Sequence, residues 1–356
     1  LAPLSKTFEL SAALRADEYT TVGGSITPKL AFKWTPNRTW ALRGSFAEGF
    51  RAPSVAESGD GGLSAFTRVR DPVRCDAGVQ SACAPATLAI VTSPNPALEP
   101  ETSRSTTLGM IFEPLVNTNV SIDVWQIKRK NEINQETADA VVAAGRVIRD
   151  PSTSTGPNDP GAIITILSSY VNSASTLVRG LDLDARQRFN LGDYGKVTLD
   201  AKWTHLFTFK RTEQDGSSVD FAGSHGNCDV TNCMGTPADR INLGADWELG
   251  AWRVATIVNH RASITSKASK QATECETHFA NGEDAPKGCK VKAFTTVDLN
   301  LRWRPMRQLE LFGSIQNLFD TKPPLDVLTY GAVSYNPLDY SGAIGRFFTV
   351  GAKYSF

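Results

Sequence analysis

The main pattern along the chain is an alternation of apolar and polar residues with a period of two. It is clearest between Lys290 and Arg304, where one alternate set is mainly apolar: Val291, Ala293, Thr295, Val297, Leu299, Leu301 and Trp303. The intervening positions carry Lys, Asp, Asn and Arg side chains, together with Phe294 and Thr296. Successive side chains of a strand point to opposite faces, whereas a helix would mix the two sets, so the pattern predicts a β-strand.

The same alternation predicts twelve strands in all. They span residues 7–19, 25–35, 39–50, 99–113, 118–132, 170–190, 195–212, 239–249, 251–268, 291–304, 308–318 and 345–356. Many exceed the five or six residues usual in a globular sheet, whereas a tilted strand that crosses a bilayer needs about 9–11. The polar positions carry many full charges, which favours a wet lumen over the dry core of a soluble sandwich. We therefore predict an all-β, antiparallel transmembrane β-barrel, with a large soluble sandwich or propeller as the alternative.

The connections between these strands support the barrel. Short and long connections alternate, as in outer-membrane barrels with short periplasmic turns and long extracellular loops. The long loops are predicted at 51–98, 133–169, 213–238, 269–290 and 319–344, and only the first outer connection is short. A separate strand at Ile163 to Ser169 would reverse this order, so we assign that segment to the loop or to an extension of the next strand.

Charge and composition exclude other classes of protein. The chain has 37 basic and 37 acidic residues, which argues against a nucleic-acid partner. The longest uncharged stretch, Gly161 to Val178, is rich in Ser and Thr and therefore excludes a helical membrane protein. Leu1 is not an initiator Met and no signal segment follows it, so we expect a chain that begins inside a processed or cut protein.

The six cysteines fall into three local pairs within the predicted long loops. We expect the disulfides Cys75–Cys83, Cys228–Cys233 and Cys275–Cys289, which require an oxidising compartment. Free thiols and a metal site are the alternatives, but no pair has the CxxC spacing of a zinc ribbon, and His278 is the only histidine near its own pair, Cys275 and Cys289. Cysteine positions were not needed to place the strands, so this agreement is independent support for the topology.

The closing segment carries an apolar residue at every second position: Phe348, Val350, Ala352, Tyr354 and Phe356. A terminal aromatic strand of this kind resembles the assembly signal of bacterial outer-membrane proteins. The resemblance implies the barrel-assembly machinery as a partner.

Four local motifs extend the resemblance over nearly the whole chain. They are Gly49 to Ser54 (GFRAPS), Asn95 to Ser103 (NPALEPETS), Arg179 to Leu183 (RGLDL) and Asn317 to Asp320 (NLFD). Together and in this order, they resemble the C-terminal half of a TonB-dependent outer-membrane receptor. The resemblance implies a 22-stranded barrel with an N-terminal plug and a TonB-contacting segment upstream of the plug.

This chain departs from that pattern, because we count about twelve strands and find neither a plug nor a TonB box. We therefore expect residues 1–356 to be the C-terminal portion of such a barrel. The implied function is TonB-energised uptake of a scarce nutrient across the Gram-negative outer membrane. The nutrient would be an iron chelate such as a siderophore, or an oligosaccharide, vitamin or peptide. The implied partners are outer-membrane lipid and the TonB complex, through the missing N-terminal region. A complete 12-stranded passive porin or translocator and a barrel enzyme are the alternatives.

Ligand contacts in this family come from the outer loops and the plug. The candidates are one arginine that could hold a carboxylate or phosphate and four aromatic or amide residues of the last loop: Arg51, Tyr330, Tyr335, Asn336 and Tyr340. Loop packing or a structural hydrogen bond is the alternative for each. The neutral charge and the tyrosines slightly favour a neutral polar ligand over an anionic ferric complex. No HExxH, GxSxG, P-loop or dinucleotide motif is present, so we expect no catalytic residue, metal or cofactor.

Overall fold

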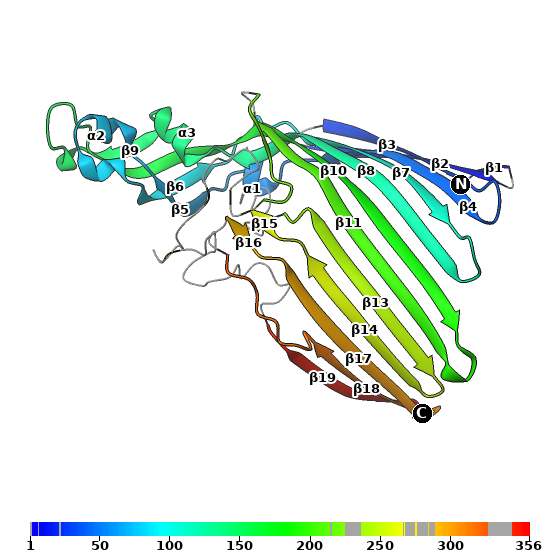
Figure 1. The fold of residues 1–356 in the computed structure, drawn as a ribbon. Helices are drawn as coiled ribbons and strands as arrows, with labels where there is room; N and C mark the ends of the chain where they lie inside the picture. Colours follow the sequence, from blue (N-terminus) through cyan, green and yellow to red (C-terminus); the bar gives the residue numbers. More distant parts are fainter. Residues whose placement is uncertain are drawn as a thin grey trace.

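The computed structural model describes residues 2–5, 7–20, 23–213, 216–224, 236–265, 289–326 and 344–356, together with Lys267, Cys275 and Asp284. Twelve long strands form one curved antiparallel wall, in which each strand pairs with the next (Figure 1). They are β2 (Phe8–Tyr19), β3 (Gly23–Trp34), β4 (Trp40–Arg51), β7 (Glu101–Phe112), β8 (Thr118–Gln135), β10 (Ala162–Asn190), β11 (Lys196–Glu213), β13 (Asp239–Leu249), β14 (Trp252–Arg261), β17 (Phe294–Met306), β18 (Leu309–Gln316) and β19 (Phe347–Tyr354). The twelve predicted strands are thus confirmed one for one. The short β1 (Ala2–Ser5) pairs with β2 at one edge.

The two faces of the wall differ in the way the alternation predicts. Large apolar side chains are exposed on one face, which we call the apolar face, for example Leu108, Val124, Leu243 and Leu301. The opposite, charged face carries cross-strand ion pairs: Arg43 with Asp123, Arg186 with Asp200 (2.6 Å) and Arg253 with Asp246 (2.6 Å). An apolar exterior around a charged interior is the arrangement of a transmembrane barrel.

The connections also follow the predicted order. The long connections leave one end of the wall, which we call the loop end, and tight turns join the strands at the other, the turn end (Figure 1). The connection from β2 to β3 is the one short link at the loop end, as predicted. At the turn end, Trp252 stacks on Trp303 with their ring centroids 5.1 Å apart. None of the described helices is long and apolar enough to cross a membrane.

Two of the predicted long loops contain several helices and strands that the sequence analysis missed. The range 51–98 holds α1 (Val55–Ser58), β5 (Leu63–Val69), α2 (Pro72–Asp76), the 3₁₀ turn η1 (Gln80–Cys83) and β6 (Ala86–Ser93). The range 133–169 holds α3 (Ala138–Ala143), β9 (Val147–Asp150), the turn η2 (Pro151–Thr153) and the start of β10. Ile163 to Ser169 is therefore an extension of the next strand, one of the two readings left open above. The remaining short elements are η3 (Gly192–Tyr194), β12 (Ser218–Asp220), β15 (Ile264–Thr265) and β16 (Lys290–Val291).

These segments build a second unit beyond the loop end of the wall, which we call the lobe (residues 55–93 and 136–169; Figure 1). Its sheet pairs β5 with β6, β6 in parallel with the first part of β10, and β10 with β9. The lobe has its own buried core, formed by Val69, Ile90, Val141, Val142, Ile163 and Ile166. β10 thus serves two sheets, because its first part belongs to the lobe and the rest belongs to the wall.

Candidate functional site

A group of charged side chains lies where the lobe joins the wall, on the charged face. We call it the rim cluster, and it comprises Arg51, Glu57, Glu101, Arg129 and Glu132. Arg51 donates to both carboxylate oxygens of Glu57, at 2.9 and 3.1 Å, and to Glu101 at 2.6 Å. Arg129 donates to the other oxygen of Glu101 at 3.1 Å. One buried carboxylate therefore holds two guanidinium groups from different strands.

The register of the wall and the cap of α1 place these groups. In the pairing of β4 with β7, Arg51 lies directly opposite Glu101. Glu57 accepts from the backbone N–H of Ser54 at 2.6 Å, which forms a capping box at the start of α1. The N–H of Asn95 donates to the carbonyl of Glu57 at 2.8 Å. The first two sequence motifs, GFRAPS and NPALEPETS, thus meet in one cluster.

Burial and hydrogen bonding act in opposite directions on the two carboxylates. Burial alone would raise the pKa of Glu101, but hydrogen bonds from Arg51, from the N–H of Ile133 and from Arg129 outweigh it and leave the pKa lowered. The pKa of Glu57 is also lowered, because bonds from Arg51 and Ser54 outweigh its burial. Both carboxylates are therefore ionised at neutral pH, and they raise the pKa of Arg51.

The cluster continues along the wall toward β11. Glu132 is 4% exposed and accepts from the hydroxyl of Thr176 at 3.0 Å. Arg211 is 5% exposed and pairs with Glu213 at 2.7 Å, while its Nη1 finds no acceptor among the described residues. Because most of these charges pair with each other, their effect is to anchor the lobe to the wall.

Within the described ranges, no three His, Cys, Asp or Glu side chains come together as a metal site would require.

The lobe carries two further buried ion pairs. Arg74 donates to both oxygens of Asp159, at 2.8 and 3.0 Å, and Arg149 donates to both oxygens of Asp71, at 2.7 and 3.0 Å. Asp71 also caps α2 by accepting from the N–H of Arg74. Hydrogen bonds, above all from Arg74, lower the pKa of Asp159. These side chains were not predicted from the sequence, since their partners are far apart along the chain.

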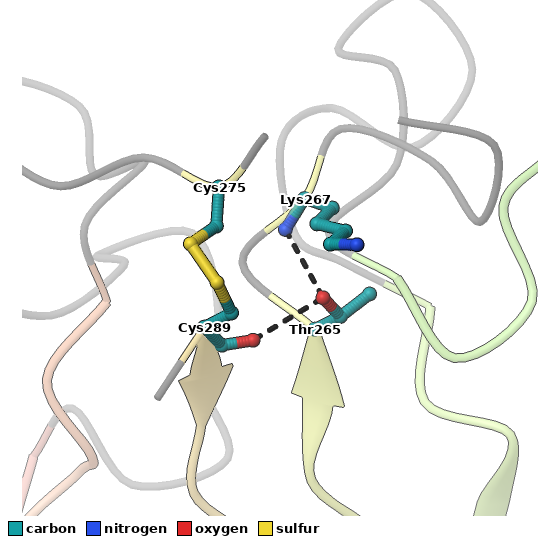
Figure 2. The surroundings of a disulfide bond; sticks show 4 residues. All are labelled: Thr265, Lys267, Cys275 and Cys289. Carbon is teal, nitrogen blue, oxygen red and sulfur yellow. Dashed lines mark hydrogen bonds between the residues drawn. A yellow bond between two sulfur atoms is a disulfide. The ribbon is translucent and has the colours of Figure 1, made fainter. Parts of the chain in front are cut away.

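The described residues include two of the three predicted disulfides. Cys75–Cys83 joins the end of α2 to η1 within the lobe. Cys275–Cys289 lies beside β15 and β16, where the Thr265 hydroxyl donates to the carbonyl of Cys289 at 3.2 Å and accepts from the N–H of Lys267 at 3.3 Å (Figure 2). Cys228 and Cys233 lie outside the described residues.

The other predicted site residues have different outcomes. Tyr330, Tyr335, Asn336 and Tyr340 all lie outside the described residues. The structure places Arg51 at the loop end, as expected, but against two carboxylates of the chain itself. The closing-strand residues Phe348, Val350, Ala352, Tyr354 and Phe356 are all exposed, and the first four alternate along β19, which pairs with β18.

Comparison with known proteins gives a consistent result. A family model described as TonB dependent receptor-like, beta-barrel, matches residues 2–318. Over 352 residues, the chain is 21% identical to a probable TonB-dependent siderophore receptor, PirA, of Acinetobacter baumannii. That match covers 96% of this chain and 40% of the relative.

Solved structures agree on the fold. The crystal structure of PirA from Acinetobacter baumannii has a TM-score of 0.65 at 18% identity and covers 99% of this chain and 44% of that one. A variant of the ferric enterobactin receptor PfeA from Pseudomonas aeruginosa, in complex with enterobactin, gives 0.64 at 17% with the same coverage. The FrpB iron transporter from Neisseria meningitidis gives 0.57 at 13%, also covering 99% and 44%. The chain thus spans less than half the length of these relatives and shares the fold of that part of them.

Proposed function

The chain belongs to the TonB-dependent receptor family, and on that premise we propose that it is part of an outer-membrane receptor that takes up a ferric siderophore with energy from TonB. The family consists of transport receptors of the Gram-negative outer membrane. The observation that carries the proposal is the wall itself, which has an apolar face, a charged face and all its long connections at one end. Relatives named as siderophore receptors favour a siderophore over the other nutrients that this family takes up.

In this proposal the loop end faces the outside of the cell and presents the binding surface. The lobe suits that task, because a buried core and two buried ion pairs hold it in one conformation before a ligand arrives. A pre-ordered surface loses less conformational entropy on binding than a mobile loop does. TonB would act on a plug encoded upstream of these residues.

We propose that Tyr330, Tyr335, Asn336 and Tyr340 add stacking and hydrogen bonds to the ligand from the last connection. Arg51 can bind an anionic ligand with both prongs of its guanidinium under one condition. Its guanidinium already holds Glu57 and Glu101, so an anionic ligand that pairs with both of its terminal nitrogens must replace Glu57. Exchanging one carboxylate for another at an arginine fork is feasible only if the ligand matches its two-pronged geometry.

Uptake of radioactive iron tests the function. The complete receptor is expressed in a host lacking its own siderophore receptors, and ferric catecholates, ferric hydroxamates and an uncharged oligosaccharide are supplied in turn. We expect saturable uptake of one ferric siderophore class, and loss of that uptake when the host tonB gene is deleted. Uptake that persists without TonB would indicate a passive porin. Uptake of the oligosaccharide alone would replace the proposed substrate class.

A further inference from the structure

Near the loop end, the side chains on the apolar face change from apolar to cationic at one level of the wall. Along β7, the residues on this face run from Phe112 through Met110 and Leu108 to Thr106 and then Arg104. The facing residues of β8 are Val120, Ile122, Val124 and Gln126, followed by Lys128 and Lys130. Apolar side chains therefore stop, and cations begin, at the same level on both strands. On a barrel wall, this level is the boundary between the hydrocarbon core and the headgroup layer.

The cations at this level face each other across the strands. Arg104 and Lys128 are direct cross-strand partners, and Lys130 lies opposite Thr102 two positions further on. On β10, Arg179 lies opposite Gln126 and donates to its side-chain oxygen at 2.7 Å. Like charges directly opposite each other on a sheet repel, so the arrangement favours a bridging anion. We call Arg104, Lys128, Lys130 and Arg179 the cationic belt.

The chain itself supplies little negative charge to neutralise the belt. Glu48 pairs with Arg104 at 2.9 Å. In the part of the chain that the structure describes, no carboxylate forms an ion pair with Lys128, Lys130 or Arg179. The belt therefore carries a net positive charge exposed on the membrane side of the wall.

A groove accompanies the belt. The pairing of β3 with β4 runs from Trp34 to Lys29 and stops before the loop end, so the two strands separate there. Between them lies a cavity of about 260 Å³, lined among others by Ile26, Glu48, Phe50, Arg104, Lys128 and Lys130. Apolar side chains thus lie beside cations, which suits a ligand that is both anionic and lipophilic.

We propose that this groove and the cationic belt bind the phosphate group of an anionic lipid in the outer leaflet of the membrane. Arg104 offers a planar fork and the lysines offer point charges to the phosphate oxygens. The acyl chains would lie along the apolar face below, over Leu108 and Met110. The inference rests on the proposed function only in that it requires the wall to lie in an outer membrane.

The test compares lipid binding by the complete receptor and two double variants. K128Q/K130Q removes two belt charges. K29Q/K33Q removes two lysines of β3 that lie on the charged face, and so controls for net charge. Each protein is reconstituted in phosphatidylcholine nanodiscs with lipid A or with its dephosphorylated form, and bound glycolipid is counted by native mass spectrometry.

We expect tight binding of phosphorylated lipid A by the wild type and by K29Q/K33Q, weakened by high salt. K128Q/K130Q should bind about 30-fold more weakly, given the usual gain for each basic residue at an anionic membrane surface. Equal binding by all three proteins, or equal binding of dephosphorylated lipid A, would overturn the proposal. So would full competition by inorganic phosphate, because the site would then take a free anion.

Iron uptake by the same variants separates this proposal from the previous one. A receptor that retains phosphorylated lipid but takes up no ferric siderophore contradicts the proposed substrate alone. A receptor that takes up iron but shows no preference for phosphorylated lipid contradicts the lipid site alone.

Discussion

Removing the lobe disulfide should loosen one short segment and leave the wall intact. Cys75 and Cys83 are eight positions apart, so their bond closes a loop of nine residues, counting both cysteines. Chain-entropy reasoning assigns such a loop about 2.5 kcal/mol. At 1.4 kcal/mol per factor of ten, the double variant C75S/C83S should raise the opened population of this segment about 60-fold.

The effect should stay local, because other interactions hold the lobe on both sides of the loop. Arg149 still pairs with Asp71 at the start of α2, and Ile166 stays in the core. The wall is held by its own strand pairing, in which every backbone group inside the membrane finds a partner. A barrel of this kind does not need a distant crosslink.

Hydrogen exchange of the complete receptor, read by mass spectrometry, measures the prediction. Peptides covering residues 72–83 should lose protection by about 60-fold in C75S/C83S, while peptides from β7 and β13 should not change. The heat resistance of the barrel on gels should also be unchanged, and ligand affinity should fall because the lobe is less ordered. Unchanged exchange at 72–83 would refute the entropic argument. Loss of heat resistance would show that the wall depends on the lobe.

Three other predictions follow from the structure. Folding lowers the pKa of Glu57 and of Glu101, so the ion pairs of these carboxylates stabilise the protein at neutral pH and are lost as pH falls below the ordinary value of 4.5. We therefore expect α1 to become protease-sensitive below that pH, while β13 stays protected. The Ile166→Ala variant removes a fully buried side chain and should destabilise the lobe by about 2–5 kcal/mol, measured by pulse proteolysis, with the exposed Ile148→Ala as a near-neutral control. Changing Phe356 to Asp should lower outer-membrane levels in cells without reducing the heat resistance of protein refolded in detergent, and normal levels in the membrane would contradict an assembly signal.

The wall could be predicted from sequence because its two environments differ so strongly. One face of each strand meets an apolar environment and the other a charged one. Apolar and polar residues must therefore alternate over most of the strand. The predicted strand 39–50 became Trp40–Arg51, and 291–304 became Phe294–Met306. The largest shift is at the start of β10, which begins at Ala162 rather than at 170 because residues 162–169 pair within the lobe; its pairing with the wall strand β8 starts at Tyr170.

The lobe could not be predicted in the same way. Leu63–Val69 and Ala86–Ser93 are too short for a reliable period, and their sheet combines a parallel pair with antiparallel ones. β6 pairs with a part of β10 about 76 residues away in the sequence, a contact that no local pattern encodes. Their common core forms only when side chains of β5, β6 and β10 pack together with Val141 and Val142 of α3.

The partner of Arg51 could have been predicted from the sequence, and knowing it changes how a ligand would bind at this site. Once two neighbouring antiparallel strands are accepted and Trp40 is set opposite Phe112, the register places Arg51 opposite Glu101. The candidate anion-binding arginine then faces a carboxylate of its own chain before any ligand is considered. A ligand that binds there has to compete with two ionised carboxylates of the chain, which favours a ligand with several well-placed acceptors over one with diffuse negative charge. Selection among ferric siderophores at this rim would therefore depend on geometry more than on total charge.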